Sequence, residues 1–292
     1  ARLTDVLPSC FASVGVEGLP NTLELPVASA FVLVLVDGLG YHNLSESLGH
    51  APFLRSHFAS ATPMSTVFPS TTAVALASLA TGELPGTHGV LGYRIKNPAT
   101  GNIINQLSGL ADVDDLTTWL GVPTLHERAH AVGTSSTIVG LPRFEKSPLT
   151  AVVHAGARYV GANNISDRVR LVRDEIGSGA GVVVLYIPEL DQTAHAQGVT
   201  SMSWLAVLEE VDGALRDLST TLPQGVEMYL TADHGVIDVP TSRHVDVVAV
   251  DWGLEGSPVV GGEPRGLQIF ATEGDANGGP HGSALASVSV DV

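Results

Sequence analysis

Two pairs of side chains in the sequence have the types and spacing of divalent-metal ligands. Asp191 and His195 are four residues apart, so on a helix they would share one face and could bind the same ion. Asp233 and His234 are adjacent, and within a strand they would point to opposite faces. The following Gly235 permits a turn that would let both face one ion. We therefore expect metal ligation here, with a surface ion pair and a capped turn as the simpler alternatives.

A hydroxyl-rich segment contains the candidates for a nucleophile. Ser70, Thr71 and Thr72 follow Pro69 and precede an apolar run at residues 73–80, which is typical of a helix N-terminus. The helix dipole favours an alkoxide there, but its effect is far too small to ionise a threonine. A nucleophile at this position therefore needs a metal. The alternative is that these hydroxyls only cap the helix.

Apolar runs that indicate buried strands precede the candidate ligands. Residues 31–36 and 181–187 are apolar at nearly every position, as central strands covered on both faces are, and residues 226–231 give a weaker signal. Asp37 directly follows the first run, where Asp-Gly could also be a simple turn. Because ligands bind beyond the carboxyl ends of strands in open α/β sheets, we expect the three segments to deliver carboxylates to one crevice.

Helical patterns alternate with these strands. They cover residues 72–80, 165–176 and 203–218, and shorter strand signals occur at residues 134–139 and 150–154. This alternation predicts an α/β fold with a largely buried sheet.

Composition and charge narrow the choice of partner. The 292 residues are 44% hydrophobic and 15% charged, which is enough to build a sizeable core. The chain has 14 Lys and Arg and 30 Asp and Glu, which gives a net charge of −16. Because a nucleic-acid polymer requires a basic surface, this balance argues against such a partner. No apolar run reaches about 18 residues, so no membrane span is expected. The first residues lack the pattern of a secretion signal, so the cytoplasm is favoured, and a signal removed before residue 1 stays open.

The acidic balance poses a problem for phosphate chemistry that bound metal would solve. Two divalent cations beside Asp37, Asp191 and Asp233 would leave a local charge of about +1, which attracts a phosphodiester. Two metals about 3.5–4 Å apart can also stabilise the attacking and leaving oxygens of an in-line displacement. The single cysteine, Cys10, excludes an internal disulfide and a cysteine-based zinc site.

In combination, these motifs resemble the alkaline phosphatase superfamily, and most closely its type I phosphodiesterase/nucleotide pyrophosphatase branch. The resemblance implies a three-layer α/β/α sandwich with a central, mostly parallel sheet. It implies one catalytic domain over residues 1–292, to which a small cap inserted at about residues 92–161 could belong. It covers nearly the whole chain and rests on Val36-Asp37-Gly38, on Thr72 through Thr81-Gly82 to His88-Gly89, on the segment from Tyr186 to Gly198, and on Thr231-Ala232-Asp233-His234-Gly235, followed by His281-Gly282.

The resemblance also implies roles for individual residues. Thr72 is preferred as nucleophile over Thr71 and Thr66, because the family nucleophile precedes the threonine of the T-G pair by nine residues, and 81 − 72 = 9. His244 is the rival of His281 as the late ligand. Zinc is the favoured metal, with manganese or iron as alternatives. The implied ligands are Asp191, His195 and His281 for one ion, and Asp37, Thr72, Asp233 and His234 for the other.

Two departures from the family pattern concern the substrate and the chain itself. Tyr93 stands where nucleotide pyrophosphatases have an asparagine that binds the phosphoryl oxygen, and the nearby Asn97 and Asn102 are out of register. Tyr93 therefore becomes the candidate substrate contact and puts a nucleotide substrate in doubt. The stretch from Asp233 to His281 is also short, which suggests that part of the natural chain is missing.

The sequence therefore predicts a metal-dependent hydrolase of phosphodiester or pyrophosphate bonds in small phosphate esters. The alternatives are a phosphomonoesterase, a phosphonate hydrolase, a catalytically inactive metal-binding module, and an ordinary α/β domain with no metal. The other histidines are expected at the surface (His42, His50, His57, His126 and His130) or in a structural turn (His88), and the tryptophans in the core (Trp119, Trp204 and Trp252).

Overall fold

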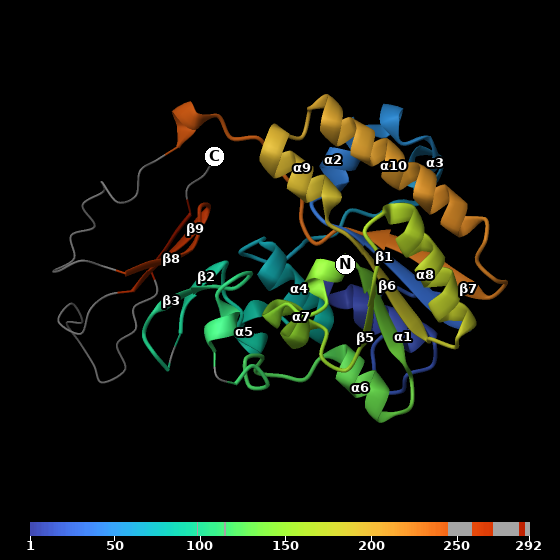
Figure 1. Cartoon of the computed structure of the whole chain (residues 1–292), viewed down its shortest axis with the longest axis horizontal. Coiled ribbons are helices and arrows are strands. Elements are labelled where there is room, and N and C mark those ends of the chain that lie inside the picture. The colour runs from blue at the N-terminus through green and yellow to red at the C-terminus, as the bar shows by residue number, and fades with distance from the viewer. Residues whose placement is uncertain (98, 114, 245–258, 271–285, 290–292) are drawn as a thin grey trace.

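The computed structural model describes residues 1–97, 99–113, 115–244, 259–270 and 286–289 (Figure 1). The helices in these ranges are α1 (Val6–Ser13), α2 (Tyr41–Glu46), α3 (Pro52–His57), α4 (Thr72–Thr81), α5 (Pro85–His88), α6 (Leu125–Ala131), α7 (Pro148–Val153), α8 (Ile165–Gly177), α9 (Glu189–Gln197) and α10 (Met202–Ser219). Short 3-10 turns are η1 (Leu3–Asp5), η2 (Leu48–His50), η3 (Phe58–Ser60), η4 (Leu110–Asp112), η5 (Pro142–Phe144) and η6 (Thr241–Arg243).

A five-stranded parallel sheet forms the centre of the fold. Its strands are β1 (Ala30–Val36), β4 (Ser136–Gly140), β5 (Arg158–Gly161), β6 (Val182–Ile187) and β7 (Val226–Thr231), in the spatial order β5-β4-β6-β1-β7. β1 pairs with both β6 and β7, so the three strands expected to precede metal ligands are neighbours. Their carboxyl ends meet at one edge of the sheet.

β1 lies at the middle of the sheet because both of its faces are apolar. All seven of its residues are buried, and alternate side chains point to opposite sides. Leu33 and its odd-numbered neighbours belong to one core with α1, α4, α6 and α7. Val34 and its even-numbered neighbours belong to a second core with α8, α9 and α10. The result is the expected α/β/α arrangement, with helices on both faces of the sheet (Figure 1).

A second, antiparallel sheet lies beside this sandwich, next to α4 and α5 (Figure 1). Its order is β10-β9-β8-β2-β3, with strands β2 (Arg94–Lys96), β3 (Ile103–Asn105), β8 (Val259–Glu263), β9 (Gly266–Phe270) and β10 (Ala286–Ser289). The expected cap region at about residues 92–161 is thus divided, since β4 and β5 belong to the central sheet. Only its first part, with β2 and β3, lies in the second sheet.

The predicted strands at residues 31–36, 181–187, 226–231 and 134–139 are confirmed, with shifts of one or two residues at their ends. The strand signal at residues 150–154 is wrong, because this segment lies mainly in α7. Pro148 occupies the first turn of that helix, and the Ser147 hydroxyl accepts a hydrogen bond from the Thr150 N–H at 3.1 Å. Both are helix-start signals that outweigh the β-branched residues.

Within the described ranges, no helix has the length and apolar character needed to span a bilayer.

A buried arginine joins the end of β6 to the start of α9. Arg168 of α8 is completely buried, and its Nη1 donates to the Tyr186 carbonyl at 2.8 Å. Its Nη2 forms an ion pair with Glu189, the first residue of α9. Because Asp191 lies two residues further along, this pair helps to place the α9 carboxylate at the sheet edge.

We expect Arg168→Met to lower the free energy of unfolding by about 3–5 kcal/mol, because it leaves the Glu189 carboxylate without its partner in a poorly solvated position. Denaturant unfolding measures the loss. The control is the double variant Arg168→Met/Glu189→Leu, which should recover much of it, since no unpaired charge remains. A loss below about 1 kcal/mol in the single variant would contradict this role for the ion pair.

Candidate metal and active site

Three aspartates from different segments meet at the carboxyl edge of the central sheet. Asp37 directly follows β1, Asp233 lies two residues beyond β7, and Asp191 lies in the first turn of α9, after β6. Asp37, Asp191 and His234 each offer a ligand atom, and these atoms all lie within 4.8 Å of one another. The expected convergence of the three segments on one place is therefore present.

Asp233 and His234 lie beyond the end of their strand, which allows both to face the same point. β7 ends at Thr231, and His234 Nε2 is 3.4 Å from Asp37 Oδ1 and 3.4 Å from Asp233 Oδ2. Asp233 Oδ1 accepts hydrogen bonds from the backbone N–H groups of Gly38 at 3.2 Å and His234 at 2.9 Å. Asp233 thereby holds the loop after β1 against the loop after β7 and still has one free oxygen.

Two glycines let these loops approach each other. Gly38 has φ of +74°, and a Cβ there would lie 2.8 Å from Val236 Cγ2 and 3.2 Å from Asp191 Oδ1. A Cβ on Gly40 would lie 2.6 Å from the Cα of Gly235. Side chains at these positions would push the carboxylates apart.

The imidazole of His234 directs its Nε2 at the cluster. Its Nδ1 lies 3.2 Å from the Gly235 carbonyl oxygen, which can only accept, so Nδ1 carries the proton. In the neutral ring, Nε2 is then unprotonated. Nε2 lies 3.4 Å from two carboxylate oxygens, where a cation between them would bind all three atoms. A histidine that donates its other N–H to a backbone carbonyl is the usual arrangement of a metal ligand.

The carboxylates have free oxygens that also fit a cation. Asp37 Oδ1, Asp191 Oδ1 and Asp233 Oδ2 are buried and have no hydrogen-bond partner among the described residues. Burial, followed by the charges of Asp233 and Asp191, raises the pKa of Asp37 well above its ordinary value. Burial likewise raises the pKa of Asp233 to about 7. The folded chain therefore opposes negative charge at this place, and oxygen and imidazole donors suit a divalent ion such as zinc.

Thr72 lies at the start of α4, beside this cluster. Its Oγ1 is 3.2 Å from His234 Nε2, so the threonine favoured by the family spacing is in contact with a candidate ligand. Thr71 Oγ1 is buried and makes no hydrogen bond within the described ranges, and Thr66 donates its hydroxyl to the Asp233 carbonyl. Thr72 does not act simply as a cap, because it is the first residue of the helix and Thr71 occupies the N-cap position.

The remaining predicted site residues differ in how close they lie to the aspartate cluster. His195 is on α9 one turn after Asp191, with its Nε2 3.4 Å from Asp191 Oδ2, and its side chain is 75% exposed. Tyr93 precedes β2, and its hydroxyl accepts a hydrogen bond from Asn105 at 2.6 Å. His281 lies outside the described residues. Its rival His244 is exposed and is not in the group of described ligand atoms around Asp37.

Sequence reasoning missed one side chain of the site and misplaced one histidine. Tyr186 donates its hydroxyl to Asp37 Oδ2 at 2.5 Å, although the sequence placed it only at the end of a strand and the start of the aspartate–histidine motif, with no role of its own. His126 is buried, not at the surface, because α6 turns it against β4, where its Nδ1 is 2.9 Å from Ser136 Oγ. Burial lowers the pKa of His126 to about 3. His88 is structural, as expected, and is buried against Ser78 at 2.8 Å.

The geometry can be compared with known families. The model of the family "Type I phosphodiesterase / nucleotide pyrophosphatase" matches residues 31–252, which is well over half of the chain. This chain belongs to the type I phosphodiesterase/nucleotide pyrophosphatase family. The expected enzyme class is thereby confirmed at the level of the family, whose members hydrolyse phosphoester bonds.

Solved structures share the fold at low sequence identity. Murine ectonucleotide pyrophosphatase/phosphodiesterase 5 is 19% identical with a TM-score of 0.65, covering 84% of this chain and 67% of its own. An inactive form of that protein in complex with AMP is 17% identical with a TM-score of 0.63, over 84% of this chain and 67% of its own. Phosphonoacetate hydrolase from Sinorhizobium meliloti 1021, with phosphonoformate, is 20% identical with a TM-score of 0.53, over 72% of this chain and 57% of its own. No curated protein matches the chain closely enough to count as a relative.

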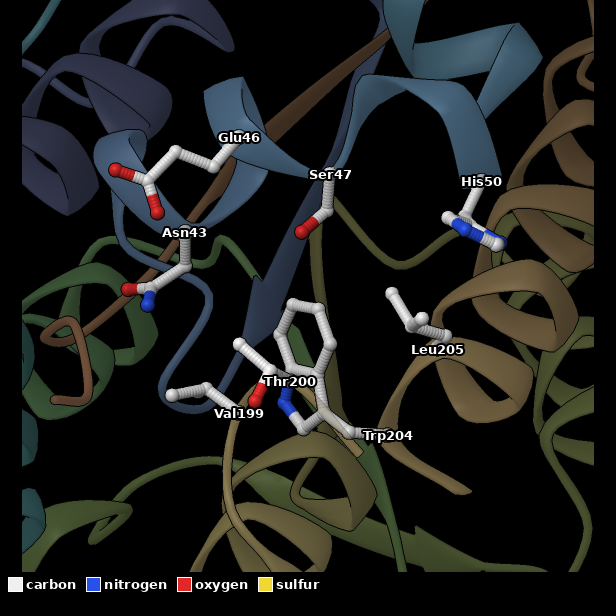
Figure 2. A pocket seen from close by; sticks show the side chains of 8 residues that line it. All are labelled: Asn43, Glu46, Ser47, His50, Val199, Thr200, Trp204 and Leu205. Carbon is white, nitrogen blue, oxygen red and sulfur yellow. The ribbon is translucent and has the colours of Figure 1, made fainter. Parts of the chain in front are cut away.

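A cavity of about 260 Å³ lies near the site but is separate from the cluster. Figure 2 shows it between α2 and the segment from Val199 to Leu205, with the Trp204 indole facing it. Asn43 is in its wall. The side-chain amide of Asn43 donates to the Val236 carbonyl at 2.7 Å and accepts from the Val236 N–H at 3.1 Å. Asn43 therefore holds the loop that carries the Asp-His pair of this family's T-x-D-H-G motif.

We expect Asn43→Ala to lower turnover and to lower the free energy of unfolding by about 1–2 kcal/mol, because two backbone groups of Val236 lose their partner. Asn21→Ala is a matched control, since Asn21 makes the same two bonds to Leu25, at 2.8 and 2.9 Å, in a loop outside the site. Both variants should lose similar stability, measured by denaturant unfolding. Only Asn43→Ala should lose activity, and equal activities would show that Asn43 does not position the loop for function.

Proposed function

We propose that this chain is a metal-dependent hydrolase of phosphodiester or pyrophosphate bonds, with Thr72 as nucleophile. The observation that carries the proposal is the meeting of three free carboxylate oxygens and one imidazole lone pair beside the Thr72 hydroxyl. Buried carboxylates with unpartnered oxygens facing one another support a bound cation, because it would stabilise their charged forms.

In this proposal, two divalent ions, zinc foremost, are held by the residues that the family pattern indicates. Asp37, Asp233, His234 and Thr72 hold one, and Asp191 and His195 hold the other together with a late histidine, His281 or His244. Such ions lower the pKa of a bound hydroxyl and stabilise the negative charge of the transferred phosphoryl group. The mixed oxygen and nitrogen donors support zinc, manganese or iron more than calcium or magnesium.

The chain's own residues prepare Thr72 for attack. The position of Thr72 at the start of α4 places its hydroxyl at the positive end of the helix dipole, and its Oγ1 lies 3.2 Å from Nε2 of His234, so both could bind the same ion. The threonine hydroxyl loses its proton to solvent, and its oxygen forms a bond to phosphorus while the bond to the leaving oxygen breaks. The leaving oxygen takes up a proton from solvent, and water then hydrolyses the phosphothreonine to a phosphate monoester and free Thr72. Tyr93, beside the second sheet, is the proposed contact for the substrate. The AMP bound by the murine relative supports a phosphate ester of nucleotide size, and the tyrosine in place of asparagine argues for a different preference.

We expect Thr72→Ala to lose turnover by a factor on the order of 10³ or more, as removal of a nucleophile does in other hydrolases, while it keeps bound metal. The measurements are steady-state hydrolysis and elemental analysis of the same preparation. Thr71→Ala is the matched control, because it removes a neighbouring hydroxyl from the N-cap, and it should stay within about tenfold of the unaltered protein. Unchanged activity in Thr72→Ala would refute the nucleophile.

The type of ester cleaved can be tested together with the metal requirement. After reconstitution with zinc, bis-nitrophenyl phosphate should be hydrolysed faster than nitrophenyl phosphate, because the proposed site, with a charge of about +1 that falls to zero with the Thr72 alkoxide, balances a singly charged diester better than a doubly charged monoester. Removal of metal with a chelator should abolish both reactions, and zinc should restore them. Faster monoester cleavage would favour a phosphomonoesterase, and faster cleavage of phosphonoacetate would favour a phosphonate hydrolase. Metal binding without turnover of any of these would favour an inactive module.

A further inference from the structure

The hydroxyl of Tyr186 determines how the Asp37 carboxylate is oriented. Tyr186 lies near the end of β6, in register with Leu35 of β1, so its ring stands close to the residue that follows β1. The phenol donates to Asp37 Oδ2 at 2.5 Å. Asp37 is 3% exposed, so water does not compete appreciably for this oxygen.

The two oxygens of Asp37 consequently have different surroundings. Oδ2 is used by Tyr186, whereas Oδ1 has no hydrogen-bond partner among the described residues and lies 3.4 Å from His234 Nε2. If the phenol were absent, the carboxylate could rotate about its Cβ–Cγ bond and present either oxygen to the cluster. With the phenol bound to Oδ2, Oδ1 is the oxygen left free for an ion.

A phenol suits this position because it is a neutral donor. A lysine or arginine beside Asp37 would add a positive charge and compete with a cation for the three aspartates. Tyr186 orients the carboxylate and leaves all of the negative charge at the site available to bind an ion. Its strand also leads into α9, which carries Asp191. The Tyr186 hydroxyl therefore connects Asp37, which follows β1, to β6, the strand that precedes Asp191.

We propose that Tyr186 is a positioning residue, whose hydroxyl holds the Asp37 carboxylate so that Oδ1 is directed at the metal. This inference rests on the proposed function, because it presupposes an ion at Asp37. Partners that orient metal ligands by hydrogen bonding typically contribute about 10- to 100-fold to metal affinity.

The test compares Tyr186→Phe with Tyr159→Phe in the full chain. Tyr159 is a matched control, because its hydroxyl donates to the Leu141 carbonyl at 2.9 Å and removing it is the same chemical change outside the cluster. Zinc affinity of the metal-stripped proteins is measured by competition with a chromophoric chelator. Tyr186→Phe should lower the affinity for one of the two zinc ions by about 10- to 100-fold and leave the affinity for the other nearly unchanged. Tyr159→Phe should alter neither affinity.

The outcomes separate this inference from the proposed function. If the unaltered protein binds no zinc, the proposed function fails. If the unaltered protein binds zinc and Tyr186→Phe binds both ions as tightly as the unaltered protein does, the positioning role fails and the hydrolase proposal stands. An equal loss of affinity for both ions would indicate general distortion of the site and would also overturn the inference.

A second measurement does not depend on the folding of Tyr186→Phe. With 3-fluorotyrosine at position 186 alone, the ¹⁹F resonance should shift as zinc is added and should stop shifting when one ion is bound at Asp37. The same label at position 159 should not respond. A ¹⁹F resonance at position 186 whose chemical shift does not change when zinc is added would contradict contact between this phenol and a metal ligand.

Discussion

The central constraint on this structure is that the fold holds three carboxylates close together, with little water to screen their mutual repulsion. Asp37 and Asp233 are almost completely buried, and each has an oxygen with no partner in the described part of the chain. Burial, and after it the charges of neighbouring aspartates, raises the pKa values of both groups. A divalent cation removes the repulsion, because one ion can satisfy the free oxygens of Asp37 and Asp233 and the lone pair of His234 at once.

The rest of the fold keeps these groups from moving apart. Parallel pairing of β1 with β6 and β7 brings three strand ends to one edge, and the glycines after β1 and β7 allow the loops to touch. Arg168 holds the start of α9, Asn43 holds the loop after β7, and Tyr186 holds the first aspartate. The candidate site is therefore positioned by polar contacts from several elements, and Asp37, Asp191 and Asp233 each keep an oxygen with no partner among the described residues.

Much of this arrangement is predictable from the sequence, since it follows from local patterns. Apolar runs identify the three strands, and the acids within four residues of their ends identify the shared edge. The spacing of Asp191 and His195 correctly predicts one helical face. The contacts of Tyr186, Arg168 and Asn43 are not predictable in this way, because each joins positions between 18 and 193 residues apart in the chain. The burial of His126 is not predictable for a similar reason, since it comes from packing against β4.

Crystallographic location of bound zinc by anomalous diffraction at the zinc edge tests the central claim most directly. With crystals grown in zinc, the account predicts an anomalous peak about 2.0–2.2 Å from Asp37 Oδ1, Asp233 Oδ2 and His234 Nε2, within reach of the Thr72 hydroxyl. A second peak is predicted beside Asp191 and His195. Crystals saturated with zinc that show no peak between Asp37 and His234 would contradict the account.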